Sequence, residues 1–285
     1  MFDLIKPWRF IKNQFANFSG LLSCVIPSCV EKFAMKKIVY VIGDRFINFN
    51  GMDGAVLYSD WCILRTGDAL RQAIYIPGQG LTTEQAFQIL DSSLRIASEE
   101  GWQFDWPSLQ LASRQQTHKQ RPENIIITAP VMAGDCIFES SLVLQRDNEL
   151  LLDHTTGFHI QGMVFLEATR QVSTAVVDIV YPKGENYYVM HDIHADYLSF
   201  AFPIETKIIL KLHEEGINDE GNESFVVRLD FIQNGRKIVT TSGRFTAITR
   251  QLMLDREQRL AQMTLQKGCR SLQKRLHPAP MLSRV

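Results

Sequence analysis

Residues Asp153–Gln171 read DHTTGFHIQGMVFLEATRQ, and this stretch decides the fold. A short loop rich in His and Gly leads directly into an apolar segment that continues without a proline to Val180. A helix that is hydrophobic on nearly every side is buried rather than exposed on a surface. Within this helix Glu167 and Arg170 stand at positions i and i+3, on one face. Because a buried carboxylate is costly unless it is paired, neutralised or used, the pair is a candidate site.

The two charged side chains suggest different chemical roles. Burial raises the pKa of a carboxyl group such as Glu167, unless Arg170 or backbone donors hold it in the ionised form. An ionised Glu167 can act as a general base, and a neutral one can act as a general acid. Arg170 has the planar donor geometry that binds a phosphate or a carboxylate through two hydrogen bonds. The alternative for both residues is a structural ion pair along one helix.

The composition is that of an ordinary globular protein. The 285 residues are 45% hydrophobic and 21% charged, and 30 basic against 31 acidic residues give a formal net charge of −1. The length fits one large domain or two small ones. A net charge so close to zero gives no bulk electrostatic argument for binding to nucleic acid or to an anionic membrane.

The sequence indicates neither a metal nor an organic cofactor. There is no phosphate-cradling glycine loop, nucleophile elbow or dinucleotide fingerprint. Five cysteines are scattered, odd in number and not at ligand spacing: Cys24, Cys29, Cys62, Cys136 and Cys269. His191 and His194 would point to opposite faces of a strand, which does not suit a shared metal ion. We therefore expect a cytoplasmic protein with reduced cysteines, no disulfide framework and no metal site.

The first 34 residues stand apart from the rest. The apolar run Leu21–Ile26 is too short to span a bilayer, and Pro27 interrupts it. We expect no integral membrane segment in the chain. Met35 precedes two lysines and the strand-like run Ile38–Ile42, which is typical of a natural chain start. We expect residues 1–34 to be a dispensable extension, or Met35 to be the true initiator.

The following eighty residues mix extended and helical patterns. The runs Ala55–Leu64 and Ala69–Ile76 have the apolar character of strands, with a turn between them. A helix is predicted from Thr82, a good N-cap residue, to about Glu100. Residues 115–123 are polar and have no periodicity, so they predict a linker.

The second half shows a clearer order. Strand-like runs at 125–127, 136–144, 196–202 and 206–213 flank the apolar helix. Two further runs, Ser224–Gln233 and Arg236–Ile248, are joined by Asn234-Gly235, which is a strong signal for a hairpin. This order predicts a long buried helix wrapped by one curved antiparallel sheet, an α+β fold. The tail from about 250 to 277 predicts a helix rich in Arg and Lys, with either a solvated basic face or an acidic partner.

The loop and the helix resemble two groups of hotdog proteins. The β-hydroxyacyl carrier-protein dehydratases have a similar motif, carried here by Asp153-His154, Gly157, Gly162, Leu166-Glu167-Ala168 and Gln171. The closer resemblance is to the A-factor biosynthesis (AfsA-like) hotdog family. Its motif is matched by His159-x-x-Gly162-Met163 followed by Leu166-Glu167-Ala168-x-Arg170-Gln171. The match is specific over these residues, and the resemblance extends over roughly Asn124–Ile248.

This resemblance implies a tandem hotdog fold, because the family repeats the domain with Glu-x-x-Arg-Gln on the first helix. Here the corresponding segment is Ser92–Ile96, in which Arg95 keeps the register and Ser92 replaces the carboxylate. We therefore expect a degenerate first repeat over 35–115 and a second hotdog domain over 124–250. A basic helix and tail would follow over 251–285.

The resemblance also implies chemistry on acyl thioesters. The protein would move a β-ketoacyl chain from an acyl carrier protein or acyl-CoA to a small phosphorylated acceptor such as dihydroxyacetone phosphate. Such a reaction belongs to the biosynthesis of γ-butyrolactone signals or related secondary metabolites. The alternatives are a thioesterase or a dehydratase acting on carrier-bound acyl chains, and a non-catalytic acyl-binding partner. The residues implied are Glu167, Arg170 and His154 for catalysis, and His159, Gly162, Met163 and Gln171 for substrate binding.

One geometric condition limits the dehydratase alternative. In hotdog dehydratases the His and the Glu of one active site come from two subunits. Within a tandem chain, His154 would face the helix that bears Ser92. Glu167 would face the loop Pro77–Leu81, which contains no His. Dehydration would therefore require a homodimer formed through the second repeat.

Overall fold

The structure, a computed structural model, describes residues 36–67, 72–99, 101, 109–153, 157–181, 186–217 and 222–276. From Lys36 onward the chain forms one structural unit. Two sequence-based expectations lie outside the described residues, namely the extension over 1–34 and the position of His154.

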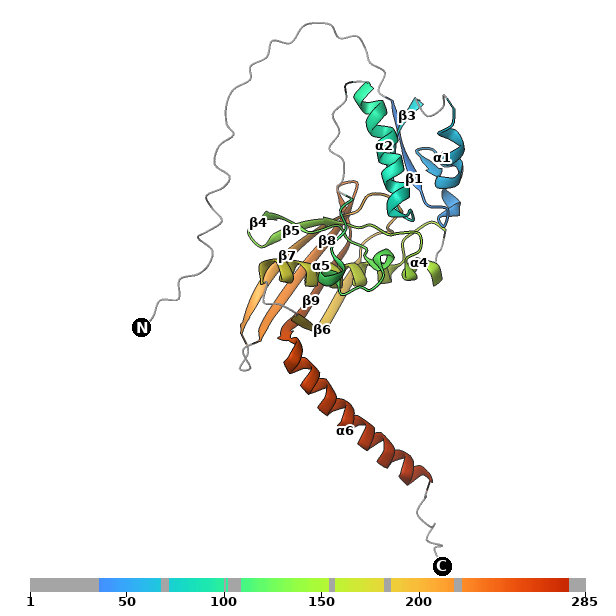
Figure 1. Cartoon of the computed structure of the whole chain (residues 1–285). Helices are drawn as coiled ribbons and strands as arrows, with labels where there is room; N and C mark the ends of the chain where they lie inside the picture. Colours follow the sequence, from blue (N-terminus) through green and yellow to red (C-terminus); the bar gives the residue numbers. More distant parts are fainter. Residues whose placement is uncertain are drawn as a thin grey trace, which may run out of the picture. The chain divides into compact units, whose positions relative to one another are not determined.

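The largest element of the described chain is an antiparallel sheet with the strand order β4-β5-β7-β8-β9-β6 (Figure 1). Its strands are β4 (Val131–Gly134), β5 (Ile137–Ser141), β6 (Asn186–Tyr197), β7 (Lys207–Ile217), β8 (Glu223–Gln233) and β9 (Arg236–Thr249). Irregularities in register occur in several pairs, for example between Met190 and Asp192 of β6. Such bulges increase the local twist of a sheet, which lets it curve around a helix.

Helix α5 (Gly162–Val180) lies against this sheet, and every residue from Gln171 to Val177 is buried. Phe165 of the helix meets Phe231 of β8 edge-on, with 5.0 Å between the ring centroids. Every second residue of β8 is buried, as the period of two along a strand requires. Removal of this apolar area from water is the main force that holds helix and sheet together. The predicted α+β hotdog fold is confirmed.

The hairpin between β8 and β9 is also confirmed. Asn234 and Gly235 form its two-residue turn, between the paired residues Gln233 and Arg236. Both turn residues have positive φ, 49° and 72°, which is the conformation that a type I′ turn requires. The strand predicted at 196–202 is wrong, because β6 ends at Tyr197 and an irregular segment follows.

The first part of the described chain has a different architecture. Its three strands pair in parallel in the order β2-β1-β3, whereas a hotdog sheet is antiparallel. The elements are β1 (Lys37–Ile42), the 3-10 helix η2 (Ile47–Phe49), β2 (Ala55–Leu57), α1 (Tyr58–Leu64), β3 (Ala73–Pro77) and α2 (Thr83–Glu99). The degenerate hotdog repeat expected over 35–115 is therefore not confirmed, and the tandem fold with it.

Two local features explain why the sequence was misleading here. The apolar run Ala55–Leu64 fits both a strand and a helix, since short apolar runs do not distinguish the two periods. In the structure it divides into β2 and α1, and Trp61 of α1 is buried in the core beside β1 and β3. Arg95 of α2 pairs with Asp91 and its side chain is 72% exposed. It therefore has none of the burial expected for a counterpart of Arg170.

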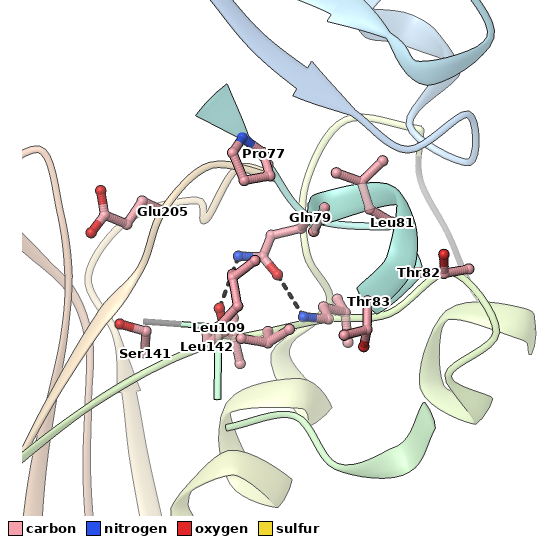
Figure 2. Close-up of a pocket in the computed structure, with 13 residues that line it drawn as sticks. Pro77, Gln79, Leu81, Thr82, Thr83, Leu109, Ser141, Leu142 and Glu205 are labelled. Atoms are coloured by element: carbon pink, nitrogen blue, oxygen red, sulfur yellow. Dashed lines mark hydrogen bonds between the residues drawn. The ribbon is translucent and has the colours of Figure 1, made fainter. Parts of the chain in front are cut away.

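One buried side chain helps to join the parallel sheet to the hotdog sheet. Gln79, in the loop after β3, donates from Nε2 to the carbonyl oxygen of Leu142 at 3.0 Å and accepts from the backbone N–H of Leu144 at 2.6 Å (Figure 2). The cavity around it measures about 50 Å³, too small for a substrate. The loop Pro77–Leu81 therefore holds the segment that follows β5.

Replacing Gln79 by Ala is expected to lower the free energy of unfolding by about 2 kcal/mol, because it leaves buried backbone groups without partners. Urea unfolding measures the loss. Gln251→Ala, on the exposed helix α6 (Arg250–Leu276), is the control and should change stability by less than about 0.5 kcal/mol. Equal, small losses in both variants would contradict the anchoring role of Gln79.

Candidate functional site

The face of α5 that bears Glu167 and Arg170 is covered by the short helix α3 (Arg114–Thr117) and the residues that follow it. The hydroxyl of Thr174 donates to the carbonyl oxygen of Gln116 at 2.9 Å. Arg170 donates from Nη2 to the carbonyl oxygen of Thr117 at 3.0 Å. The segment 115–123 is thus not a linker. It packs on α5 and forms one wall of the candidate site.

Glu167 accepts hydrogen bonds from three side chains. Arg170 donates from Nη2 to Oε1 at 2.7 Å and from Nε to Oε2 at 3.0 Å, which makes the pair bidentate. Lys119 places its Nζ 2.8 Å from Oε1, and Gln171 donates from Nε2 to the same oxygen at 2.8 Å. The side chains of Glu167, Arg170 and Lys119 are 21%, 29% and 27% exposed, so this charged cluster is mostly removed from water.

These contacts decide the ionisation state that the sequence left open. Burial alone raises the pKa of the Glu167 carboxyl, but the hydrogen bonds and charge of Arg170, together with the hydrogen bonds of Lys119 and Gln171, outweigh it and lower the pKa to about 2. Glu167 is therefore a carboxylate at neutral pH. A group already ionised cannot serve as a general acid, so the cluster leaves Glu167 the roles of base, hydrogen-bond acceptor or structural ion-pair partner.

The depressed pKa makes the stability of the protein depend on pH. Because the folded-state pKa of about 2 lies below the ordinary value of 4.5, the stabilisation is fully present above pH 4.5 and is lost as the pH falls towards 2. We expect this carboxylate to account for on the order of 3 kcal/mol of that loss. Urea unfolding of the wild type and of Glu167→Gln across this range measures it. If both proteins lost the same stability on acidification, the ion cluster would not be as described.

A cavity of about 360 Å³ lies beside the carboxylate. Its polar wall includes Lys119, Glu167 and Arg170, and its apolar wall includes Met190 and Ile193 of β6. Met163 also lines it, with the residue 57% exposed at the surface. The volume lies within the range of ligand-binding pockets. Of the residues singled out from the sequence, Glu167, Arg170 and Met163 thus share one cavity.

Gln171 is fully buried and does not line this cavity. Its Nε2 donates to the carbonyl oxygen of Asn124 at 2.9 Å as well as to Glu167, and its Oε1 accepts from the backbone N–H of Ile126 at 3.0 Å. The amide therefore links the carboxylate to the segment that covers it. Gln171 positions Glu167, whereas the resemblance had implied contact with substrate.

His159 and Gly162 line a second cavity of about 570 Å³ at the N-terminal end of α5. The His159 ring lies 5.1 Å from that of Phe200, measured between centroids. Gly162 contacts Tyr197, whose hydroxyl donates to the Gly162 carbonyl oxygen at 3.0 Å. A Cβ at position 162 would lie 2.8 Å from that hydroxyl oxygen, so any other residue there would require the exposed Tyr197 side chain to shift. The structure therefore separates His159 and Gly162 from the Glu167 cluster.

Lys119 and Asn124 are among the residues of the Glu167 cavity that sequence reasoning missed. Lys119 belongs to the polar stretch 115–123 that lacks periodicity, and Asn124 directly follows that stretch. Both reach α5 only through tertiary contacts. The sole local signal was a lysine placed in a segment adjoining the hotdog domain. The spacing of residues along the sequence shows neither where the Lys119 side chain points nor that its partner is Glu167.

The antiparallel sheet, its buried helix and the charged cluster on that helix define a hotdog protein. Residues 103–249, just over half of the chain, match the A-factor biosynthesis hotdog domain. The chain belongs to this family.

Solved structures show more distant similarities. A conserved protein from Pseudomonas aeruginosa is 18% identical, with 48% of this chain and 100% of that chain covered and a TM-score of 0.36. A thioesterase from Haemophilus influenzae is 12% identical, with 50% and 92% covered and a TM-score of 0.37. No curated protein matches the chain. Among the described residues, no helix combines the length and the apolar character needed to cross a membrane.

Proposed function

We propose that the protein is an acyltransferase that moves a β-ketoacyl chain from an acyl carrier protein or acyl-CoA thioester to the hydroxyl of a small phosphorylated acceptor such as dihydroxyacetone phosphate. Membership of the A-factor biosynthesis family supports this class of reaction. The observation that carries the proposal is the cluster of Glu167, Lys119 and Arg170 on the wall of a substrate-sized cavity whose other side is apolar. Such a cavity suits an acyl chain on one side and an anionic acceptor on the other. The expected compartment is the cytoplasm.

The contacts assign different roles to the two cations. Arg170 already gives two donors to Glu167 and one to the Thr117 carbonyl oxygen, so its main role is to hold the carboxylate. Lys119 approaches only one oxygen of Glu167 and has further N–H donors that can reach into the cavity. Lys119 is therefore the better candidate for binding the acceptor phosphate, the role that the donor geometry of its side chain had suggested for Arg170.

The chemistry follows from this arrangement. The acceptor hydroxyl attacks the thioester carbonyl carbon, the C–O bond forms and the C–S bond breaks. The hydroxyl proton passes to Glu167 and then to the departing thiolate of the carrier. A carboxylate with a pKa of about 2 is a weak base, but an acceptor phosphate that binds Lys119 removes one of its stabilising donors and raises that pKa. Acceptor binding thus activates the base.

A specific observation favours the non-catalytic alternative. Both oxygens of Glu167 already accept hydrogen bonds, as expected of a structural ion cluster in an acyl-binding protein. A thioesterase would use the same cluster with water in place of the acceptor. A dehydratase would need a histidine, and no histidine lines the Glu167 cavity among the described residues.

We include a homodimer in the proposal. β6 is an edge strand of the described sheet, and large apolar side chains on it and just after it are exposed, among them Met190, Tyr197 and Phe200. An exposed apolar edge of this kind is a surface that a second copy can cover. It adjoins the Glu167 cavity, to which β6 contributes Met190 and Ile193.

Mass spectrometry of the products separates these functions. The protein is incubated with β-ketoacyl carrier thioester, with and without dihydroxyacetone phosphate. A phosphorylated ester that forms only with the acceptor supports the proposal. Free acid formed at equal rates in both reactions indicates a thioesterase, and unchanged thioester with measurable affinity indicates a binding protein. A dehydrated product, tested with a β-hydroxyacyl thioester, indicates a dehydratase.

Lys119→Met should raise the KM for the phosphorylated acceptor by about tenfold or more while changing kcat much less, because it removes a charged hydrogen bond to the phosphate. Steady-state kinetics at varied acceptor concentration measures the effect. Lys211→Met, on the exposed face of β7, is the matched control and should leave KM unchanged. An unaltered acceptor KM in Lys119→Met would remove this lysine from the phosphate site.

A further inference from the structure

The C-terminal helix α6 has no buried residue along its 27 positions, and it continues directly from β9 (Figure 1). At a rise of about 1.5 Å per residue it is about 40 Å long. Helices in proteins owe most of their stability to packing of an apolar face. Within the described residues nothing buries a face of α6, although it carries several exposed large apolar side chains.

The apolar residues of α6 form a stripe. At about 100° per residue, five of them fall within an arc of about 60°: Leu254, Ala261, Leu265, Leu272 and Leu276. The side chains of the four leucines are exposed to solvent. Four other large apolar residues lie outside this stripe, on the other side of the helix: Leu252, Met253, Leu260 and Met263. The stripe therefore runs to the end of the helix at Leu276, whereas the other four residues spread over a wider arc of about 100° and end at Met263.

The charges of α6 are segregated as well. The side of the helix opposite the leucine stripe carries Arg259, Lys267, Arg270 and Lys274. Together with Arg275, these make five cations between Gln258 and Leu276, a segment that contains no carboxylate. The helix has two acidic residues, Asp255 and Glu257, and both lie in its N-terminal third. The near-zero net charge of the whole chain thus conceals a strongly basic helix.

We propose that α6 binds the surface of an anionic lipid bilayer, with the leucine stripe at the boundary of the acyl chains and the Lys and Arg side chains among the headgroups. A helix with a narrow apolar stripe and a basic opposite face lies in the plane of such a surface. Anionic headgroups attract clustered cations, and the attraction is screened by salt. This inference is independent of the reaction proposed for the Glu167 site.

The charges disfavour the other ways of covering the stripe. Two parallel copies of α6 would place like-charged halves side by side, and an antiparallel pair could offset the five distal cations of each copy with only Asp255 and Glu257 of the other. An acidic protein satisfies the cations, but it must also offer an apolar groove that follows the helix. A bilayer supplies negative charge and apolar depth along the whole length of α6.

Co-sedimentation of the full chain with lipid vesicles tests the proposal. We expect binding to vesicles of phosphatidylcholine mixed with phosphatidylglycerol, none to phosphatidylcholine alone, and a bound fraction that falls as salt is raised. Leu265→Gln with Leu272→Gln should weaken binding at least about tenfold. Lys267→Glu with Arg270→Glu should do the same through the charge. Circular dichroism verifies that each variant keeps its helix content.

The matched control is Leu260→Gln with Met263→Gln, which removes two apolar side chains of α6 that lie outside the stripe. It should keep the vesicle affinity within about twofold. Failure of the wild type to sediment with phosphatidylglycerol vesicles at low salt would overturn the proposal. Equal losses in the stripe and control variants would overturn it too. So would tight binding of α6 to an acyl carrier protein in the absence of any vesicle binding.

Discussion

Replacing Glu167 by Gln is expected to lower the rate of acyl transfer by at least about 100-fold. The amide keeps the size of the side chain but cannot take a proton from the acceptor hydroxyl. It also leaves Lys119 and Arg170, both within 3 Å of the present carboxylate, without their shared counter-charge. Single-turnover measurements with saturating thioester and acceptor isolate the chemical step from substrate binding.

Glu149→Gln is the matched control for this variant. Glu149 lines the same cavity, but it pairs with Arg121 at the surface and its side chain is 59% exposed. Its replacement should leave the transfer rate within about twofold, since exposed ion pairs contribute little. Full activity in Glu167→Gln would show that the carboxylate is only a structural partner of Arg170.

Replacing Gln171 by Leu is expected to lower the free energy of unfolding by about 4 kcal/mol, the largest stability effect that we expect from a single substitution in this protein. Leu has a similar size, but it leaves the Ile126 N–H and the Asn124 carbonyl oxygen without their partner in a fully buried place. It also removes one donor from Glu167. Urea unfolding at neutral pH gives the value.

Thr174→Val serves as the control, because Thr174 is buried one turn further along α5 and also bonds to the covering segment through Gln116. It loses hydrogen bonds from one hydroxyl, so a cost of about 1 kcal/mol is expected. If Gln171→Leu cost no more than Thr174→Val, Gln171 would not be the link between α5 and the covering segment.

The parts of the fold that could be predicted from the sequence have strong local signals. Helix α5 was predicted because its run of apolar residues has no break, and the hairpin because Asn234-Gly235 favours one turn type. Glu167 and Arg170 were found in the same way, since their spacing along one helix fixes their relative position. Helix α6 was recognised from its helical pattern, and its basic character from its composition.

The parts that could not be predicted depend on contacts between distant segments. The position of Lys119 beside Glu167 is set by the path of the chain after α3, which no periodicity encodes. The parallel pairing of β1 with β2 and β3 joins strands that are separated along the chain, so no turn residue marks it. The similarity of the segment around Arg95 to the motif around Arg170 concerns residue type alone, because Arg95 is exposed and paired only on its own helix.

Net charge was equally uninformative about α6. The balance of the whole chain argued against an anionic surface, but electrostatic attraction depends on where charges lie within a screening length of about 8 to 10 Å. Along the helix, neighbouring cations lie within such distances of one another from Lys267 to Arg275, and the compensating carboxylates lie elsewhere in the chain.

The central claim is that the Glu167 carboxylate is held ionised by Lys119 and Arg170 until an acceptor phosphate draws Lys119 away. Carbon-13 NMR of the labelled glutamate carboxyl, titrated with and without dihydroxyacetone phosphate, tests it most directly. The account predicts a pKa of about 2 in the free protein and a clearly higher one with the acceptor bound. An ordinary value near 4.5 in the free protein, or a value that does not respond to the acceptor, would contradict it.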